Sequence, residues 1–302
     1  MQVPRVSPDL DSPTNAAVES AAQSTTQSPT QPATRHRLAV VCSHAIQYFM
    51  PWFRALSAHP RLQVKVLLGD GHGLDGASFD PGFGRPVRWD SPLTEGIDVL
   101  RLRNRSPRPG VGRFSGVINP ELWSLLTPER FDAVLIHGWN YALYPMALAA
   151  ARAHGLPVLL RGESPLLPPE SSAAPPPPSD TFARLRRAAR DAVLRRYVGA
   201  CAAGLAVSSG NRRLLLSLGL PPDRVFFTPY TVDTARFTLT PEDAAAARAE
   251  QRAALKLDDA TPLILFVGKL QAVKQPERLL SAYAALRAAG TRAALAFAGD
   301  GE

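Results

Sequence analysis

The chain has 302 residues, room for one large or two ordinary domains, and 45% of them are hydrophobic, which suffices for a buried core. Its 34 basic and 26 acidic residues give a formal net charge of +8. That balance suits a protein that handles anionic substrates or membrane surfaces, and it equally fits an arginine-rich composition with no polyanionic partner. No apolar run reaches the roughly 18 residues of a membrane-spanning helix. Cys42 and Cys201 match no disulfide framework and no metal-ligand spacing, which is typical of a reducing, cytoplasmic compartment.

The first 36 residues differ in composition from the rest of the chain. They are rich in Ser, Thr, Gln, Pro and Ala and show no apolar periodicity. Such a segment buries too little apolar surface to offset the entropy of folding, so residues 1–36 are predicted to be a disordered tail.

Beyond the tail, short apolar runs alternate with helical patterns. Strands are predicted at 38–43, 63–68, 97–102, 131–136, 156–160, 204–207 and 225–228. Helices are predicted at 182–198 and 211–218, and in the segment that carries Pro51, Trp52, Phe53 and Leu56. This alternation is typical of a parallel α/β sheet, so residues 37–235 are predicted to form a Rossmann-like domain.

Residues 69–90 are predicted to be a loop, because glycines and prolines interrupt any strand pattern there. The loop also carries Asp70, His72, Asp75 and Asp80. Their spacing matches no metal-ligand pattern, and divalent ions need tighter clustering, so no metal site is predicted.

The strand at 131–136 runs into the sequence HGWNY. Ligands of open parallel sheets bind at the carboxyl ends of the strands, so His137, Trp139 and Asn140 would lie at that edge. Aromatic faces stack on the C–H surfaces of sugars, while imidazole and amide groups hydrogen-bond hydroxyls, and the three residues could form a sugar platform. The alternative is a packed aromatic cluster with a helix cap.

Two other strands end in polar residues at the same edge. His44 and Gln47 follow the first strand, where His44 is either a structural polar residue or part of a site. Arg161 and Glu163 follow the strand at 156–160 and form either a local ion pair or a clamp for an acceptor.

The helix at 182–198 is dense in arginine. Leu185, Ala189 and Ala192 share one face, but Arg196 falls inside it, so the amphipathic pattern is imperfect. A membrane-surface helix would carry larger apolar residues in place of the alanines. The basic face could nevertheless contact anionic lipid.

Residues 236–261 are predicted to be a hinge with a connecting helix at 242–255, and residues 262–302 form one predicted βαβ unit. The unit consists of a buried strand at 263–267, a helix that begins at Pro276, and a second buried strand at 295–298.

Lys269 and Lys274 lie in the first turn of this unit. Free N–H groups at a helix start, together with the lysine charges, could bind an anion there. Solvated lysines are the alternative. Neither a P-loop nor a G-x-G-x-x-G loop is present, which argues against a P-loop NTPase and a dinucleotide dehydrogenase.

Two stretches of the chain resemble group 1 glycosyltransferases (glycosyltransferase family 4). One is FVGKLQAVKQPERLLSAYAAL followed by FAGDG, within residues 266–301, and the other is the pattern H-x-x-Q-Y-F-x-P-x-F-R-x-L that begins at His44. The resemblance covers nearly everything from Leu38 to Glu302. It implies a two-domain GT-B fold, with one complete Rossmann-like domain and the start of a second within which the chain ends.

The resemblance also implies which residues act. His137 and Lys274 would be catalytic, and the nucleotide diphosphate would be held by Gly268, Lys269, Lys274 and Gly299, with Lys269 in place of the family's arginine. The acceptor or sugar side would comprise His44, Gln47, Trp139, Asn140 and Glu163.

The implied activity is transfer of a sugar from a nucleotide-diphosphate donor to an acceptor hydroxyl with retention, in cell-envelope or exopolysaccharide glycan synthesis. No cofactor or metal is expected, because the lysines supply the positive charge. The expected partners are a nucleotide sugar and a glycan or lipid-linked acceptor, with peripheral contact to the inner face of an anionic membrane as a further expectation. Nucleic acid is not expected, because no aromatic-basic interleaving marks a binding face.

Two other functions fit the same sequence. Another GT-B enzyme, such as a nucleotide-sugar epimerase, would turn over a UDP-sugar without any acceptor. A non-enzymatic binding module would hold an acceptor or partner on its amino-terminal domain. The end of the chain just after Gly-Asp-Gly favours that module, and this chain is expected to be inactive alone.

Overall fold

The computed structural model describes residues 34–74, 76–80, 83–89, 93–166 and 180–301. Nearly all of the predicted tail lies outside the described residues, and so does the proline-dense stretch 168–178, which the sequence predicts to be an extended loop. Strand β1 (His36–Cys42) begins inside the range predicted to be tail. The reason is backbone pairing, because His36 and Arg37 continue the ladder with Leu62 and Gln63 although their side chains are polar.

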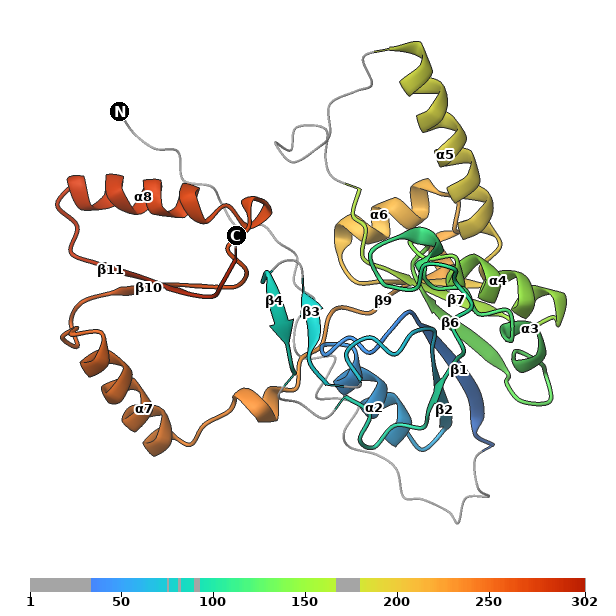
Figure 1. Cartoon of the computed structure of the whole chain (residues 1–302), viewed down its shortest axis with the longest axis horizontal. Helices are drawn as coiled ribbons and strands as arrows, with labels where there is room; N and C mark the ends of the chain where they lie inside the picture. Colours follow the sequence, from blue (N-terminus) through green and yellow to red (C-terminus); the bar gives the residue numbers. More distant parts are fainter. Residues whose placement is uncertain (1–33, 75, 81–82, 90–92, 167–179, 302) are drawn as a thin grey trace. The chain divides into compact units, whose positions relative to one another are not determined.

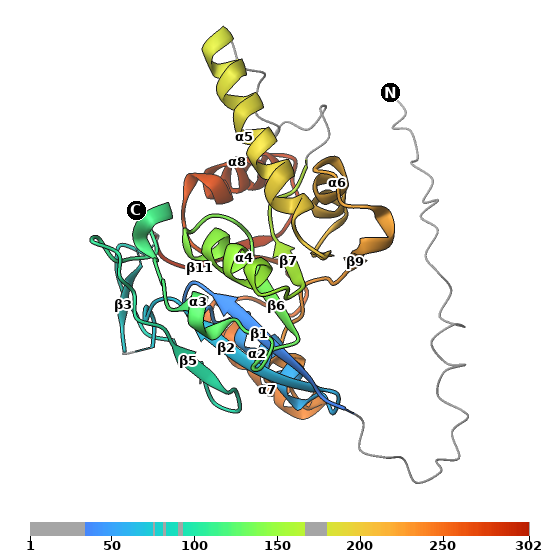
Figure 2. The ribbon, with the colours of Figure 1, turned by 90° about the vertical axis from the view of Figure 1, so that its right-hand side faces the viewer.

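A seven-stranded parallel sheet organises residues 36–227 (Figures 1 and 2). Its strand order is β5-β2-β1-β6-β7-β8-β9, which confirms the predicted parallel α/β architecture. Besides β1, the strands are β2 (Leu62–Leu68), β5 (Val99–Arg101), β6 (Ala133–His137), β7 (Val158–Gly162), β8 (Ala203–Ala206) and β9 (Val225–Phe227). The chain order reverses between β1 and β6. Sheets of this kind bind ligands at the carboxyl end of such a reversal point.

Helices cover both faces of this sheet because alternate strand residues point to opposite sides. On one face, Val40 and Cys42 pack with Phe53 of α2 (Met50–Ala58). On the other face, Ala39 and Val41 belong to the core cluster that takes in the remaining helices. Those helices are α3 (Leu122–Leu125), α4 (Leu143–Ala153), the end of α5 (Thr181–Gly199) and α6 (Ser209–Ser217).

The predicted loop at 69–90 is wrong in part, because it contains an antiparallel hairpin. Strand β3 (Ser78–Asp80) pairs with β4 (Arg85–Val87). Each strand has three residues, and none of the six is buried. The sequence therefore shows no apolar alternation from which a strand could be predicted.

The predicted elements of the last segment are present. They are α7 (Pro241–Ala254), β10 (Leu263–Val267), α8 (Pro276–Ala288) and β11 (Ala294–Ala298), and β10 pairs with β11 in parallel. Thr240 caps α7, since its side-chain oxygen accepts a hydrogen bond from the Asp243 N–H at 3.1 Å.

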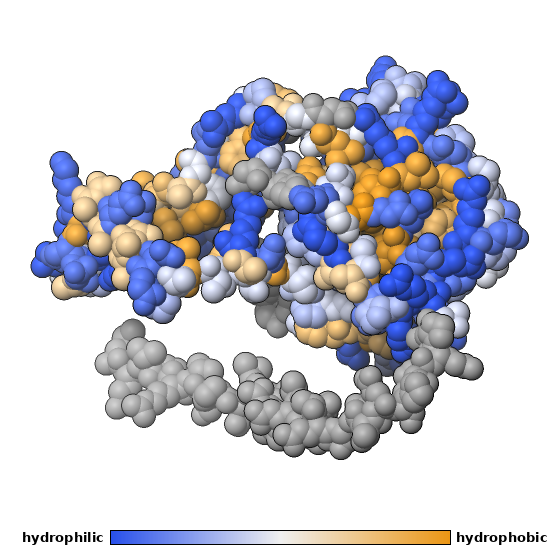
Figure 3. Space-filling model, turned by 90° about the horizontal axis from the view of Figure 1, so that it is seen from below, coloured by the Kyte–Doolittle hydropathy of each residue, from blue (hydrophilic) through white to orange (hydrophobic). Residues whose placement is uncertain are grey.

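The expected burial of β10 and β11 is wrong. No residue of either strand is fully buried, and Leu265 and Val267 are 57% and 73% exposed. A parallel strand is buried only when helices cover both faces of its sheet, and this sheet has two strands with α8 as the connecting helix. Apolar surface is visible on this segment at the left of Figure 3.

None of the helices in the described ranges is both long enough and apolar enough to cross a lipid bilayer.

Candidate functional site

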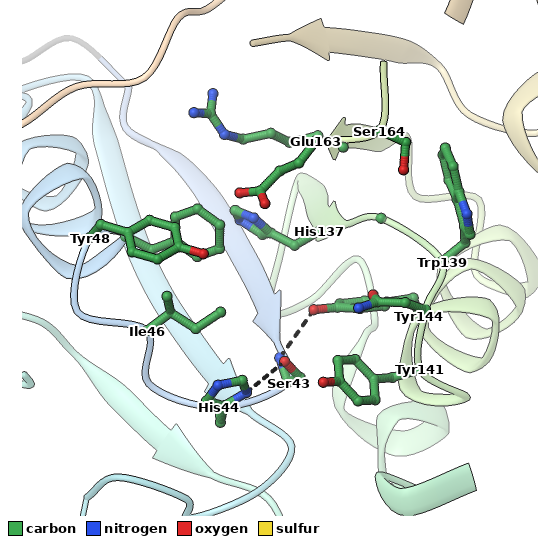
Figure 4. A pocket seen from close by; sticks show the side chains of 15 residues that line it. Ser43, His44, Ile46, Tyr48, His137, Trp139, Tyr141, Tyr144, Glu163 and Ser164 are labelled. Carbon is green, nitrogen blue, oxygen red and sulfur yellow. Dashed lines mark hydrogen bonds between the residues drawn. The ribbon is translucent and has the colours of Figure 1, made fainter. Parts of the chain in front are cut away.

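The carboxyl ends of β1, β6 and β7 surround a cavity of about 280 Å³, here named the carboxyl-edge pocket (Figure 4). It lies at the reversal point of the strand order, where the fold predicts a ligand site. Its lining residues are Ser43, His44, Ile46, Tyr48, Phe49, His137, Gly138, Trp139, Asn140, Tyr141, Tyr144, Arg161, Gly162, Glu163 and Ser164.

Five of the residues predicted from the sequence line this one pocket: His44, His137, Trp139, Asn140 and Glu163. Gln47 does not line it. Gln47 instead borders a neighbouring cavity of about 340 Å³ between α2 and the segment that follows β9, and Tyr48 lies between the two cavities.

His137 is the last residue of β6 and is only 8% exposed. Its imidazole is surrounded by aromatic rings, with centroid distances of 4.6 Å to Phe49, 5.5 Å to Phe53 and 5.8 Å to Trp52. Burial, and next the positive charge of Arg161, lower the pKa of His137 to about 3, so the ring is neutral at pH 7.

The Nε2 atom of His137 is buried and has no hydrogen-bond partner among the described residues. Buried polar atoms are nearly always paired in folded proteins, and an exception calls for an explanation. In Figure 4 the side chains of His137, Glu163 and Tyr48 converge on one part of the pocket. His137 thus borders the pocket, and no described residue satisfies its Nε2 atom.

Arg161, expected to form either a local ion pair or an acceptor clamp with Glu163, sits in β7 directly opposite His137 in the ladder. Its Nη1 donates to the Thr228 carbonyl oxygen at 2.8 Å and to the Thr228 hydroxyl at 3.2 Å. Its guanidinium lies 4.4 Å from the Trp52 ring centroid and 5.6 Å from that of Tyr230. The sequence did carry a sign of an unusual role for Arg161, because it is a charged residue in an apolar run that predicts a buried strand.

The expected ion pair between Arg161 and Glu163 is absent from the described contacts, in which Arg161 pairs with Thr228 instead. Glu163 interacts with Tyr230. Burial, and next a hydrogen bond to Glu163, raise the pKa of the Tyr230 hydroxyl. Burial, and next the negative charge of Glu163, also raise the pKa of Tyr48 to about 12. The Glu163 carboxylate is thus flanked by two protonated phenols that can donate hydrogen bonds.

His44 forms the opposite side of the pocket with Ser43. The Ser43 hydroxyl lies 3.0 Å from Nδ1 of His44, and the Ser43 N–H donates to the Tyr144 hydroxyl at 3.3 Å. Burial, and next the charge of His72, lower the pKa of His44 to about 4. His44 is therefore a neutral hydrogen-bonding group at pH 7.

Tyr197 of α5 holds the loop between β6 and α4 in place through two contacts. Gly138 has a φ of +80°, a left-handed conformation that favours glycine, and its carbonyl oxygen accepts from the Tyr197 hydroxyl at 2.8 Å. The Trp139 ring packs edge-on against Tyr197, 6.4 Å between centroids. Trp139 and Asn140 are thereby presented on a fixed loop.

The lysines predicted to bind phosphate do not line the carboxyl-edge pocket. The Lys269 ammonium lies 2.5 and 2.7 Å from the two carboxylate oxygens of Asp80, with the ring of Phe83 at 4.7 Å. Lys274 is exposed and ends a short 3-10 turn, Ala272–Lys274, directly before α8. An anion on Lys269 would compete with Asp80, whereas Lys274 has no ion pair within the described ranges.

The two predicted cofactor-binding glycines have a clear backbone role. A Cβ atom on Gly299 would lie 1.9 Å from the Gly268 carbonyl oxygen, and the Gly268 N–H donates to the Ala298 carbonyl at 3.0 Å. Gly268 also has a φ of +148°. Close passage of two chain segments therefore accounts for both glycines without any ligand.

Within the described ranges, no three His, Cys, Asp or Glu side chains gather in a way that could hold a metal ion. Cys42 and Cys201 are buried free thiols.

Comparison with known proteins bears on the family and on the fold. The family model described as Glycosyltransferase Family 4 matches residues 85–236, just over half of the chain. No curated protein matches the sequence.

Solved structures share the architecture at low sequence identity. HepE from Anabaena, in complex with UDP and glucose, gives a TM-score of 0.53 at 13% identity over 89% of this chain and 70% of its own. HepE in complex with UDP gives 0.51 at 15% identity, over 83% and 57% of the two chains. A UDP-GlcNAc 2-epimerase from Neisseria meningitidis scores 0.47 at 17% identity, over 87% and 66%. On the match of the family model, and with a Rossmann-like GT-B sheet, the chain belongs to glycosyltransferase family 4.

Proposed function

We propose that this protein transfers a sugar from a nucleotide-diphosphate donor to an acceptor hydroxyl with retention, in cell-envelope or exopolysaccharide glycan synthesis. Membership of the family supports the reaction class. The HepE structures were solved with UDP, glucose or UDP-glucose, which supports a UDP-sugar as donor. The observation that carries the proposal is the unpaired, buried Nε2 of His137 in the carboxyl-edge pocket.

His137 is proposed to hydrogen-bond a hydroxyl of the donor sugar. A neutral imidazole can donate from one nitrogen or accept at the other, and a depressed pKa keeps His137 neutral throughout the physiological range. The aromatic rings around it exclude water, which strengthens that hydrogen bond.

Trp139 and Asn140 are proposed to form the platform for the sugar ring, through stacking and amide hydrogen bonds. Glu163, His44 and Gln47 are proposed to face the acceptor. The protonated phenols of Tyr48 and Tyr230 would orient the Glu163 carboxylate toward the acceptor hydroxyl.

Lys269 and Lys274 are proposed to bind the diphosphate, with the backbone at Gly268 and Gly299 close by. In the transition state, negative charge grows on the departing nucleoside diphosphate, and a fixed ammonium group stabilises it. Two lysines supply this charge without a metal ion. Lys269 must exchange its Asp80 partner for phosphate, whereas Lys274 is accessible as it stands.

The decisive experiment incubates the purified chain with a panel of UDP-sugars, with and without polysaccharide and lipid-linked acceptors. Release of UDP that requires an acceptor, together with a glycosylated product of the donor's anomeric configuration, would support the proposal and would overturn the expectation that this chain is inactive alone. Release or isomerisation of the sugar without any acceptor would overturn the proposal in favour of an epimerase. Binding of an acceptor with no turnover of any donor would overturn it in favour of a binding module.

The matched control is a pair of histidine variants. His137→Ala is expected to abolish most of the turnover, while His154→Ala, at an exposed histidine outside the pocket, is expected to retain it.

A further inference from the structure

A second cavity, of about 320 Å³, lies at the opposite end of the strands from the carboxyl-edge pocket and is here named the amino-edge pocket. Residues near the starts of β1 and β2 line it, together with Asp98, directly before β5, and Phe131, close to the start of β6. Its volume is at the lower end of the range of about 300–1,000 Å³ in which small-molecule sites fall. The proposed sugar transfer makes no use of it.

The amino-edge pocket exists because a short connection leaves part of one sheet face uncovered. Between β5 and β6 the chain forms α3, which has four residues, and the 3-10 turn Phe114–Gly116, in place of a long crossover helix. Leu100 of β5 is therefore 37% exposed, although its ladder partner Leu67 is fully buried. Parallel sheets are normally covered by helices on both faces, so this opening is unusual for the fold.

The floor of the amino-edge pocket is apolar and already packed. Leu67 is fully buried and Phe131 is 6% exposed, and both belong to the core cluster on this face. Leu125 of α3 packs against the same cluster and also lines the cavity. An apolar group that entered the cavity would be removed from water against surfaces that are already in place, which lowers the entropic cost of binding.

The rim of the amino-edge pocket is positively charged. Lys65 is the one charged residue of β2, and its ammonium lies 3.0 Å from the Asp98 carboxylate. Arg37 is already neutralised, because its Nη2 lies 2.6 Å from Oδ1 of Asp132. Arg130 is exposed at the cavity and takes part in no ion pair with any described residue. The rim thus keeps one uncompensated positive charge, on Arg130.

We propose that the amino-edge pocket binds a small organic carboxylate with an apolar body, its carboxylate on Arg130 and its body against Leu100 and Phe131. One uncompensated positive charge matches a monoanion, and a planar guanidinium can bind a carboxylate through two parallel hydrogen bonds. Lys65 becomes a second cation for the ligand when it leaves Asp98. This site goes beyond the proposed sugar transfer, and it shares no lining residue with the carboxyl-edge pocket.

The test measures binding of octanoate to the full chain by methyl NMR with labelled leucines. Two matched probes separate the two parts of the ligand, because 1-octanol has the same apolar body without the charge and acetate has the charge without the body. Octanoate is expected to shift the methyl signals of Leu67, Leu100 and Leu125 saturably, with a Kd of about 1 mM or tighter. 1-Octanol is expected to bind at least about tenfold more weakly, and acetate to cause no shift.

The signals of Leu265 and Leu280, which are exposed on the last segment of the chain, serve as the internal control. Octanoate shifts of equal size at these two leucines would show non-specific apolar association only and would overturn the proposal. Equal affinity for octanoate and 1-octanol, or no saturable shift with octanoate, would overturn it as well.

Two charge variants are expected to change the affinity in opposite directions. Arg130→Gln should weaken octanoate binding about tenfold, because the cation that pairs with the carboxylate is lost. Asp98→Asn should tighten it about threefold, because a repelling charge is removed and Lys65 loses its partner. The matched controls are Arg105→Gln and Asp223→Asn, at exposed positions outside the cavity, and both should bind as the unchanged chain does. An unchanged affinity in both pocket variants, or equal changes in the controls, would contradict the assignment.

Leu100→Trp tests the apolar floor, because the larger side chain fills the cavity while every charge stays in place. It is expected to weaken octanoate binding about tenfold or more, and urea denaturation checks that this variant is folded. A second copy of the chain on this face would instead appear as concentration-dependent sedimentation that Leu100→Trp abolishes. That result, together with no octanoate shift, would overturn the ligand site. Neither outcome bears on the sugar transfer, which is measured separately and rests on other residues.

Discussion

His137 and Arg161 are partners in the parallel ladder of β6 and β7, and each has a buried side-chain nitrogen without a hydrogen-bond partner in the described part of the protein. An unsatisfied buried polar atom costs about 1–3 kcal/mol of folding free energy, so two of them at one sheet edge destabilise the fold substantially. A ligand that pairs with either atom removes part of that cost. We therefore expect the pocket to favour a polyhydroxyl compound over an apolar one.

The first prediction concerns acid stability. The pKa of His137 in the folded protein is about 3, below its ordinary value of 6.5, so the unfolded chain binds a proton in this range that the folded chain does not. The stability that depends on the neutral ring is complete above pH 6.5 and is lost as the pH falls toward 3. His137→Gln is therefore expected to flatten the decline in unfolding free energy between pH 7 and 4 by about 2–3 kcal/mol.

Urea denaturation across that pH range measures the effect. His44, whose pKa of about 4 is also depressed by burial, is expected to contribute in the same direction, so His44→Gln should flatten the curve further. His154→Gln, at an exposed position, serves as the control. A His137→Gln protein with the wild-type pH dependence would contradict a buried neutral imidazole.

The second prediction separates sugar contact from nucleotide contact. His137→Ala is expected to lower kcat about a hundredfold or more by removing one hydrogen bond to the reacting sugar. Calorimetry with UDP is expected to give an unchanged Kd, because the proposed diphosphate ligands lie in the turns after β10 and β11 and not in the carboxyl-edge pocket. A tenfold weaker Kd for UDP would place His137 at the nucleotide instead.

Much of the fold was predictable because buried parallel strands have a strong local signal. All seven strands of the main sheet were predicted within a few residues, since each needs an apolar run. The hairpin of β3 and β4 was missed, because three-residue strands on the surface have no such run. The exposure of β10 was also missed, because a run of five apolar residues reads the same whether one face or both are covered.

The position of the candidate site residues was predictable as far as strand ends determine it. His44, His137 and Glu163 follow from the rule that ligands meet the carboxyl edge, and all three line one pocket. The partner of Arg161 could not be predicted, because its contact with Thr228 joins residues far apart in the sequence. The pairing of Lys269 with Asp80 was hidden for the same reason.

The third prediction concerns the two lysines. Lys274→Ala is expected to reduce turnover about a hundredfold, because one charge-assisted contact to a leaving group contributes about 2–4 kcal/mol. Its Tm is expected to stay unchanged, because the side chain is exposed. Lys269→Ala is expected to reduce turnover too, but also to lower Tm slightly through loss of the Asp80 ion pair. Arg287→Ala on α8 is the control of equal charge. Wild-type turnover in the Lys269→Ala/Lys274→Ala double variant would sink the diphosphate assignment.

The last prediction is that limited proteolysis separates the main sheet from the segment that follows it. Residues 229–240, between β9 and α7, are all exposed, and thermolysin has apolar sites there at Val232, Phe237 and Leu239. The main sheet closes its hydrogen-bond ladders and its core within residues 36–227, so the fragment from about residue 37 to the linker should persist. Strands β10 and β11 form a two-stranded sheet without a fully buried residue, and such sheets are only marginally stable alone. Residues 262–301 should therefore be degraded after the first cut.

Mass spectrometry of samples taken during the digestion identifies the fragments and the order in which they disappear. Recovery of an intact 262–301 fragment beside a degraded main sheet would show that stability is distributed the other way round.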